Sequence, residues 1–422
     1  MNRRNILIAV GIVVLLFLGY LIVKPRPKGA IRFFEDQPYN FQVLRTLGHA
    51  PFGGADSGEI LSIVKDISEG DDESWYTSWM RMARRVEKWG RSLADRVGRG
   101  RALLRAHNYY RTAEFFLHPQ DERRKETFGK SVELFFDALR DLRVRYQVIP
   151  VPCGEHTLKA IYYPGSSESR SKPLIVAHGG YDSTLEELYF MIAAAARERG
   201  YACLTFEGPG QGSVIREQGV QFTPEWEKPT GAVLDEFIKR YGNPGKIVLL
   251  GASLGGYLAP RAAAFDKRID GVVSYDVCYD FQEAALMQVP AVMRFLHSSG
   301  CIGLVNTLIK FKMRNTPGVR WGVRNAQWTM GAKDPADLLR IFDLYNLRDE
   351  AEKITCDVLI LAGEADHFFP VEQVEKFKRA LVNARSVTTR IFTEEEGGHE
   401  HCQVGAFNLF HGVLFNWIEE KF

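Results

Sequence analysis

The spacing of hydrophobic positions in the first third of the chain is that of helices. Five positions recur at alternating four- and three-residue steps, which places them on one face of a helix, usually a core face: Trp75, Trp79, Met82, Val86 and Trp89. Two later patterns, ALLRAHNYYRTAEFFL and KETFGKSVELFFDALRDL, are separated by the polar HPQDERR and favour two antiparallel helices. We therefore expect residues 33–145 to form an all-helical cap.

From about Arg145 the pattern changes to short β-rich runs. Eight of them follow one another along the chain: RYQVIPV, LKAIYYP, PLIVAHGG, YACLTFEG, KIVLLG, GVVSYD, DVLILAG and SVTTRIF. Several alternate with helical stretches, which is typical of a mainly parallel, doubly wound sheet with helices on both faces. The prediction is an α/β core over residues 146–422, interrupted near the site by a helical insertion at about 279–350.

An uncharged apolar run of 18 residues, Ile6 to Val23, precedes the cap. As a helix it would be about 27 Å long, close to the thickness of the hydrocarbon core of a membrane. A cleaved signal peptide is the alternative, but YLIVKPRPKG contains no small-x-small cleavage site. We therefore expect residues 6–23 to be a single-pass transmembrane anchor, and the flanking Lys and Arg residues favour a cytoplasmic catalytic domain.

Composition excludes several classes of function. A chain of 422 residues with a formal net charge of +2 and no long run of like charge gives no basis for nucleic-acid binding. The six cysteines are scattered without a CxxC pair, so neither a zinc ribbon nor a disulfide framework is indicated. No G-x-G-x-x-G follows the first predicted strands, and EGPGQG has a different spacing, so no cofactor is expected.

The segment Val248 to Ala264 places a serine between a strand and a helix. Its sequence, VLLGASLGGYLAPRAAA, contains G-x-S-x-G with Ser253 at the centre. The serine of this motif lies in a strained turn, where neighbouring glycines let the strand and the helix pass close together. A plain turn is the alternative, but the position between a buried strand and a helix favours Ser253 as a nucleophile.

A serine nucleophile needs a base, and the base needs a carboxylate, in the expected chain order Ser, acid, His. Asp366 follows a strongly apolar strand and is the leading acid, with Glu364 and Asp276 as rivals. Asp276 ends the run GVVSYD, so it is either the acid or a second polar group beside the substrate. His399 and His401, in the loop EEEGGHEHCQVG, are both candidates for the base.

A metal site is the competing interpretation of the C-terminal histidines. It would use His399, His401 and His411 as ligands. Apart from Cys402, no carboxylate or thiolate set stands at a convincing spacing, so no metal is expected.

The negative charge that develops on a carbonyl oxygen during attack must be met by N–H donors. The turn at Ser253 supplies the N–H of Leu254, and the loop AHGGYDST supplies that of Gly180 or Tyr181. His178, in the same loop, is expected to be structural. The apolar and aromatic faces of the cap and of the insertion predict a mostly apolar pocket with few polar groups.

Five ordered motifs resemble a known group of enzymes: AHGGYDSTLEELYF, LTFEGPGQG, GASLGGYLAPRAAA, AGEADHFFP and EHCQVG. They are similar to α/β-hydrolases of the kind that includes 2,6-dihydropseudooxynicotine hydrolase, which cleaves a carbon–carbon bond beside a ketone. The stretches RFFEDQPYNFQVLRTLGHAPFGGADSGEI and EGDDESWYTSWMRMARRVEKWG look closer still to fungal hydrolases of fusarin- and cytochalasan-type biosynthetic clusters.

The resemblance runs from about residue 32 to the C-terminus. It implies the α/β-hydrolase fold with a helical cap over the site, Ser253 as nucleophile and Asp366 as acid. It also implies His401 as base, because the histidine of the family directly precedes a cysteine. The apolar run at residues 6–23 lies outside the resemblance.

These inferences predict a serine hydrolase that acts on a bulky ketone-, amide- or ester-bearing small molecule, such as a polyketide or polyketide–peptide intermediate of secondary metabolism. A general membrane-anchored carboxylesterase or peptidase is one alternative, although a large helical cap disfavours long peptides. A non-catalytic binding protein of the same fold is another, although an intact set of Ser, Asp and His favours catalysis.

Overall fold

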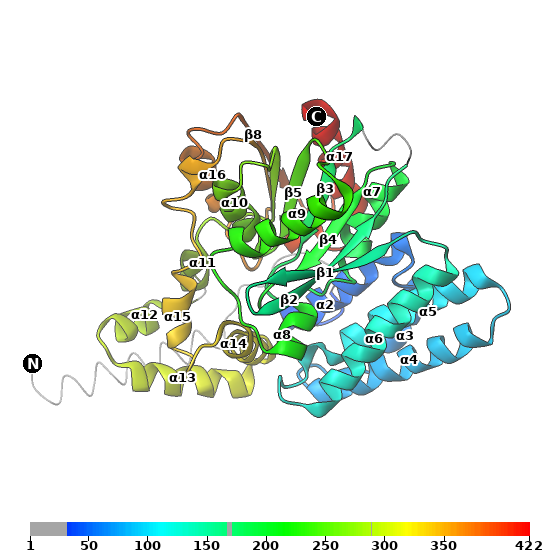
Figure 1. Ribbon diagram of the computed structural model, residues 1–422. Coiled ribbons are helices and arrows are strands. Elements are labelled where there is room, and N and C mark those ends of the chain that lie inside the picture. The colour runs from blue at the N-terminus through cyan, green and yellow to red at the C-terminus, as the bar shows by residue number, and fades with distance from the viewer. Residues whose placement is uncertain (1–31, 167–170, 288) are drawn as a thin grey trace, which may run out of the picture.

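The computed structural model describes residues 32–166, 171–287 and 289–422 (Figure 1). The apolar run at residues 6–23, predicted to be a transmembrane anchor, lies outside these ranges. Within them, no helix combines the length and the apolar character that crossing a membrane requires.

The N-terminal part of the described chain is helical and lies to one side of the sheet (Figure 1). Its α-helices are α2 (Gln37–Gly48), α3 (Ser57–Val64), α4 (Asp72–Ser92), α5 (Arg96–Ala113) and α6 (Glu122–Asp141). Each of them follows an aspartate whose side chain accepts a backbone N–H of the first turn. Such a cap satisfies donors that a helix start leaves unpaired, so the sequence fixes where each helix begins.

The aromatic stripe of α4 forms much of the interior of the cap. Trp75 and Trp79 are fully buried, and the ring of Trp75 meets that of Phe116 edge-on, with 4.9 Å between centroids. Trp89, the last position of the stripe, is 51% exposed and lies against the guanidinium of Arg105. The predicted core face therefore holds along the stripe except at its final residue.

The eight strands form one sheet in the order β1-β2-β4-β3-β5-β6-β7-β8. They are β1 (Gln147–Cys153), β2 (His156–Tyr163), β3 (Leu174–His178), β4 (Cys203–Glu207), β5 (Ile247–Ala252), β6 (Gly271–Tyr275), β7 (Asp357–Gly363) and β8 (Ser386–Phe392). The pairs β1–β2 and β2–β4 are antiparallel, and the other pairs are parallel. Every residue of β3 to β7 is buried, because helices cover both faces. The predicted mainly parallel sheet is confirmed.

Alternate residues of the central strands face two separate hydrophobic clusters. In β5, Val248 and Leu250 belong to one cluster and Leu249 to the other. The first cluster joins the sheet to the cap and to two core helices, α7 (Ala194–Glu198) and α17 (Phe407–Lys421). The second joins it to α8 (Gly212–Gln218), α9 (Glu227–Tyr241), α10 (Gly255–Phe265) and α16 (Glu372–Ala380). The cap thus shares its hydrophobic core with one face of the sheet.

Between β6 and β7 the chain inserts helices α11 (Phe281–Met287), α12 (Ala291–Ser298), α13 (Ile302–Asn315), α14 (Pro317–Met330) and α15 (Asp337–Phe342). Helices α12 and α13 lie apart from the sheet, and α14 lies nearer the cap (Figure 1). The indole of Trp321 on α14 donates to the carbonyl oxygen of Phe115 in the cap at 3.1 Å. The Tyr181 hydroxyl of the core donates to the carbonyl oxygen of Gly322 at 2.8 Å. Helix α14 therefore contacts both the cap and the core.

Candidate active site

Ser253 lies in a tight turn between β5 and α10. Its φ is +62°, a left-handed conformation that non-glycine residues rarely adopt, and its N–H donates to the carbonyl oxygen of Tyr275 at 2.6 Å. A Cβ on Gly251 would lie 2.1 Å from the carbonyl oxygen of Gly255, so only glycine lets strand and helix approach this closely. The predicted strained strand–turn–helix geometry is therefore present.

Asp366 and His401 meet directly although 35 residues separate them. His401 Nδ1 lies 2.7 Å from Asp366 Oδ2, and both side chains are buried. The other carboxylate oxygen, Oδ1, accepts the N–H groups of Phe368 and Phe369 at 2.7 and 3.1 Å. Three donors thus fix the Asp366 carboxylate in the loop after β7.

Asp366 and His401 each stabilise the charged form of the other. Burial alone would raise the pKa of Asp366, but the charge of His401 and their hydrogen bond hold it below its usual value. Burial alone would lower the pKa of His401, but the Asp366 carboxylate holds it well above its usual value. A proton that reaches the imidazole is therefore stabilised by Asp366.

Asp276, in the loop after β6, is a second carboxyl group beside His401. It is fully buried, with Oδ2 3.8 Å from His401 Nδ1, and this oxygen accepts the N–H of Cys402 at 2.9 Å. Burial and repulsion from Asp366 raise the pKa of Asp276. Of the two carboxyl groups, Asp366 is thus the nearer to the histidine and the more readily ionised.

Asp276, Asp366 and His401 also have the spacing that a metal ion could use, with one ligand atom of each within 4.8 Å of the others. However, Asp366 Oδ1 and Asp276 Oδ2 already accept backbone N–H groups, and Asp366 Oδ2 meets the imidazole. These oxygens are thus held as hydrogen-bond acceptors, which is the arrangement of a group that orients a base.

Ser253 and the histidine loop share one backbone acceptor. The Ser253 N–H and the Cys402 thiol both donate to the carbonyl oxygen of Tyr275, at 2.6 and 3.7 Å. Cys402 Sγ also lies 3.5 Å from His401 Nε2. Within the described residues the Ser253 hydroxyl makes no hydrogen bond, so His401 Nε2 faces the thiol in this conformation. Contacts between nucleophile and base often tighten only when substrate binds.

The loop after β3 touches the Ser253 turn. A Cβ on Gly180 would lie 2.6 Å from the nitrogen of Leu254. In the described ranges, the N–H groups of Leu254, Gly180 and Tyr181 have no hydrogen-bond acceptor. The predicted donors are thus adjacent and unused, as a site for a developing oxyanion requires.

His178, in the same loop, is fully buried. Its Nδ1 lies 2.9 Å from the carbonyl oxygen of Gly179, and its Nε2 accepts the indole N–H of Trp226 at 3.2 Å. Burial lowers the pKa of His178 to about 4, so the ring is neutral at pH 7. Its contacts are those of a structural histidine.

This geometry can be set beside known proteins. Residues 174–406, which include Ser253, Asp276, Asp366 and His401, match the profile of a family described as the alpha/beta hydrolase family. The chain belongs to this family. The predicted fold family is therefore confirmed, as is the prediction of an enzyme that hydrolyses its substrate.

Its relatives include fungal enzymes of secondary metabolism. Hydrolase acrC of Aspergillus aculeatus is 35% identical to this α/β hydrolase over 93% of the chain and 98% of its own length. The 20-hydroxy-prefusarin hydrolase FUS2 of Gibberella moniliformis is 33% identical over the same shares of the two chains, 93% and 98%. Among solved structures, that of 2,6-dihydroxy-pseudo-oxynicotine hydrolase is similar, with a TM-score of 0.67 and 20% identity over 89% of this chain and 95% of that one. The predicted resemblance to fungal hydrolases and the predicted resemblance to the oxynicotine hydrolase are both confirmed.

Two predicted rivals lie elsewhere in the α/β hydrolase. Glu364 is exposed, and its carboxylate accepts the N–H of Glu394 rather than facing His401. His399 Nε2 lies 4.0 Å from Glu400 Oε1, and its Nδ1 has no partner among the described residues. The structure therefore brings Asp366 to His401 and not to His399.

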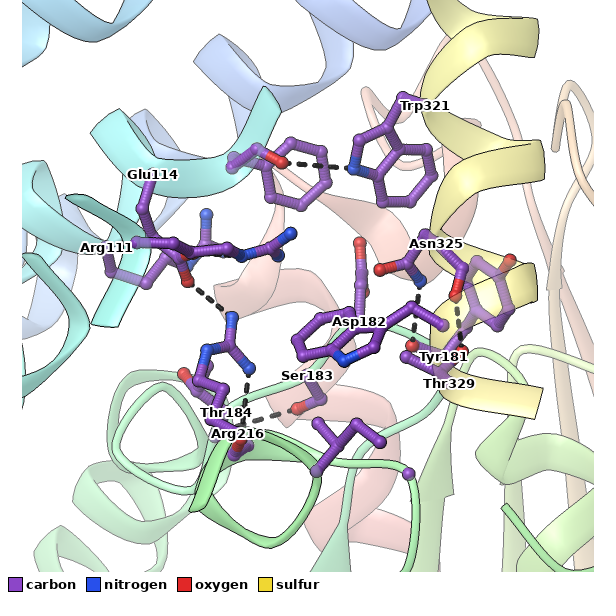
Figure 2. Close-up of a pocket in the computed structure, with 16 residues that line it drawn as sticks. Arg111, Glu114, Tyr181, Asp182, Ser183, Thr184, Arg216, Trp321, Asn325 and Thr329 are labelled. Carbon is purple, nitrogen blue, oxygen red and sulfur yellow. Dashed lines mark hydrogen bonds and ion pairs between the residues drawn. The ribbon is translucent and has the colours of Figure 1, made fainter. Parts of the chain in front are cut away.

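The apolar pocket predicted over Ser253 stays a prediction, because the cavity described next is lined by neither Ser253 nor His401. A cavity of about 390 Å³, its mouth included, lies where the cap, the core and α14 meet (Figure 2). Its charged lining residues are Arg111, Glu114, Arg124, Asp182 and Arg216, and its aromatic ones are Phe115, Tyr181, Trp321 and Trp328. The apolar faces of the cap helices pack against one another and the sheet, so charged residues at their margins remain to line the cavity.

Gln211 is a site residue that the sequence reasoning missed. Its side-chain amide donates to the carbonyl oxygens of Gly179 and Gly180 at 2.8 and 3.0 Å. These bonds hold the peptide groups of the loop after β3 in place. The signal is the motif EGPGQG, which carries Gln211 and does not have the spacing of a nucleotide-binding pattern.

Proposed function

We propose that this enzyme is a serine hydrolase in which Ser253 is the nucleophile, His401 the general base and Asp366 the group that orients the base. The observation that carries the proposal is the buried 2.7 Å contact of Asp366 with His401, next to a serine at φ +62° in a strand–turn–helix. The chain order Ser, Asp, His supports it, and the proposed steps need no cofactor.

In the first step, His401 Nε2 turns from the Cys402 thiol to the Ser253 hydroxyl and takes its proton. Ser253 Oγ bonds to the carbonyl carbon of the substrate, and the electron pair of the carbonyl π bond moves to the oxygen. The N–H of Leu254, with that of Gly180 or Tyr181, stabilises this oxyanion. The unused donors described above fit this role.

Collapse of the tetrahedral intermediate breaks the bond to the leaving group, which takes the proton from His401. Water, deprotonated by the same nitrogen, then bonds to the acyl carbon, the bond to Ser253 Oγ breaks, and Oγ takes back the proton from His401. An alcohol or amine leaves readily once protonated. A carbon leaving group requires an adjacent carbonyl to delocalise its electron pair, so carbon–carbon cleavage needs a β-dicarbonyl substrate.

The proposed substrate is a bulky ketone-, amide- or ester-bearing small molecule, such as a polyketide or polyketide–peptide intermediate. Full-length similarity to fungal secondary-metabolite hydrolases, one of them named for 20-hydroxy-prefusarin, supports this class. A general membrane-anchored carboxylesterase or peptidase is the competing function. The cavity between cap and core favours a compact molecule over a long peptide.

Labelling with a fluorophosphonate tests the catalytic assignment without knowledge of the substrate. The mass increase should fall on the peptide that carries Ser253, and Ser253→Ala should not be labelled. His401→Ala should lose about 10⁴- to 10⁶-fold in labelling rate, whereas His399→Ala, the matched control in the same loop, should keep most of it. Normal labelling of Ser253→Ala, or loss in His399→Ala alone, would show the assignment to be wrong.

We further propose that residues 6–23 anchor the enzyme in a membrane, with the catalytic domain in the cytoplasm. The surface of the insertion supports this. Residues 284–333 contain no Asp or Glu but seven basic residues: Arg294, Lys310, Lys312, Arg314, Arg320, Arg324 and Lys333. The same segment exposes large apolar side chains: Met287, Phe295, Ile302, Leu304 and Phe311. Basic and apolar side chains together suit the surface of an anionic membrane.

The anchor would leave the fold beside that surface, because Pro38 packs against Gly318 at the start of α14; a Cβ on Gly318 would lie 2.5 Å from Pro38 Cγ. The full chain should resist carbonate extraction from membranes, and deletion of residues 1–28 should release an active enzyme. Release of the full chain into the supernatant contradicts the anchor. A mature N-terminus near residue 25 indicates a cleaved signal peptide, and protease digestion of intact vesicles reports the orientation.

A further inference from the structure

Three polar atoms in the lining of the cavity are buried without a partner among the described residues: Thr184 Oγ1, Arg111 Nε and Arg216 Nε. Thr184 and Arg111 are 3% and 2% exposed. A buried N–H or O–H group without an acceptor is costly in a folded protein and calls for an acceptor at that place. Since these residues come from the cap, from the loop after β3 and from α8, the acceptor they lack belongs in the space between them (Figure 2).

The charges of the lining residues do not cancel. Three guanidinium groups, those of Arg111, Arg124 and Arg216, stand against two carboxylates, those of Glu114 and Asp182. Glu114 is shared, since its two oxygens accept from Arg124 and from Arg216. An excess positive charge in a largely buried site attracts an anion more strongly than it would in water.

The two lining carboxylates are already held by arginines. Glu114 lies between Arg124 and Arg216, and Asp182 Oδ2 lies 3.0 Å from Arg45 Nη1. Burial would raise the pKa of Glu114, but the two arginines beside it lower it. Burial, and then repulsion from Arg45, lowers the pKa of Arg111, and both arginines share the Glu187 carboxylate. With Arg45 and Glu187 included, four arginines still stand against three carboxylates. A bound anion would therefore offset the positive charge of the arginines, whereas the two carboxylates are already paired with arginines and need no added cation.

The cavity adjoins the place where chemistry is proposed. Tyr181 and Asp182 line it, and the preceding residue, Gly180, packs against the nitrogen of Leu254. Arg124, also in the lining, lies over the ring of Trp328 at 4.6 Å, which holds the guanidinium plane. A group bound in this cavity would thus belong to a molecule whose next atoms lie beside the oxyanion loop.

We propose that the cavity binds an acidic group of the substrate, a planar pair of oxygens sharing one negative charge, such as a carboxylate or the enolate of a 1,3-dicarbonyl, with Arg111, Arg216 and Thr184 as donors. The proposal rests on the proposed function, because it names a feature of the substrate of that site. The Nη atoms of Arg111 and Arg216 already donate within the protein, so each guanidinium offers its Nε–H. A planar pair of oxygens can accept one N–H from each arginine, and Thr184 adds a hydroxyl donor.

Binding to the full-length Ser253→Ala protein tests this without catalysis. The probes are 4-phenylbutyrate and its neutral counterpart 4-phenylbutanamide, which differ in charge at nearly constant shape. By calorimetry the carboxylate should bind at least about tenfold more tightly than the amide, as charge-assisted bonds require. In the Arg216→Gln background this preference should disappear. Equal affinity of the two probes for the protein with Arg216 intact overturns the proposal.

A second pair of variants separates binding from folding. Thr184→Val removes an unpartnered hydroxyl, so the thermal midpoint should not fall, but affinity for 4-phenylbutyrate should drop about tenfold. Thr230→Val removes another buried, unpartnered hydroxyl that does not line the cavity, and it should leave the affinity unchanged. Identical affinities in the two variants overturn the role of Thr184. Both results stand whether or not Ser253 proves to be the nucleophile, which the labelling experiment decides separately.

Discussion

Replacing Asp366 by asparagine should lower the reaction rate more than replacing it by alanine, because backbone N–H groups fix the orientation of the side chain at this position. Asp366 Oδ1 accepts the N–H groups of Phe368 and Phe369, and Oδ2 faces His401 Nδ1. In Asp366→Asn the amide oxygen must stay at the Oδ1 position, so its NH₂ group faces Nδ1. A donor there favours the imidazole tautomer with its proton on Nε2, which cannot accept the proton of Ser253. We expect a loss of about 10⁴.

In Asp366→Ala no side chain at position 366 imposes a tautomer on His401, and Asp276 remains near the imidazole. Without Asp366, the repulsion that helps to raise the pKa of Asp276 is gone, so Asp276 ionises more readily. Its oxygen lies 3.8 Å from His401 Nδ1, against 2.7 Å for Asp366. With an effective dielectric constant of about 20, these separations give roughly 4.4 and 6.1 kcal/mol of attraction. The difference corresponds to about a twentyfold loss of rate.

The rate constant for fluorophosphonate labelling at pH 7 measures both effects. The alanine variant should be slower by about twentyfold and the asparagine variant by about 10⁴, and Asp276→Asn combined with Asp366→Ala should approach the latter. Thermal unfolding is the control, since the alanine variant leaves two N–H groups without their acceptor at about 1–3 kcal/mol each. Equal rates for folded alanine and asparagine variants would refute the reasoning.

Three further predictions follow from the same geometry. Gly180→Ala should lower kcat by at least about 10² and also lower the thermal midpoint, because its Cβ would lie 2.6 Å from the Leu254 nitrogen and force the backbone apart; normal kcat contradicts a role for this loop. Gln211→Leu removes two bonds that hold the loop and should lower kcat more than it changes KM; an effect on KM alone would assign it to binding. Burial lowers the pKa of five described histidines, to about 3 for His49, to about 4 for His107, His178 and His411, and in the same direction for His118, so the unfolded chain binds more protons below about pH 6.5. Stability should therefore fall with pH from 6.5 towards 4, opposed by the buried carboxyl groups of Asp276, Glu186 and Glu207, whose pKa values burial raises, and a thermal midpoint unchanged between pH 7 and 5 would contradict this.

The parts of the site that could be predicted from sequence are those that local pattern controls. A buried strand followed by G-x-S-x-G fixes the turn of Ser253, and an apolar strand before Asp366 places that carboxylate at the end of β7. The choice between His399 and His401 could not be made from spacing, because both stand in one loop. It depends on which imidazole the fold turns towards Asp366.

The cavity could not be predicted, because its partners are distant in sequence. Arg111 pairs with Glu187 across 76 residues, and Arg216 with Glu114 across 102. A helical periodicity shows which face of a helix is apolar, but not which charges at its margin will meet. Trp89 illustrates the same limit, since it continues the stripe of α4 and yet is 51% exposed, with the guanidinium of Arg105 from α5 against its ring.

Asp276, Asp366 and His401 stand on loops at the ends of β6 and β7 and before α17, whereas the cavity is lined partly by the cap and α14 and partly by the loop after β3 and α8. The residues proposed to move protons and those proposed to bind the substrate are therefore carried by different segments of the chain. Exchange of side chains on the cap and on α14 can alter substrate choice while the acid–base chemistry persists. An inherited division of this kind lets one ancestral enzyme give rise to descendants with different substrates, and it makes cap exchange between relatives a practical route to altered specificity.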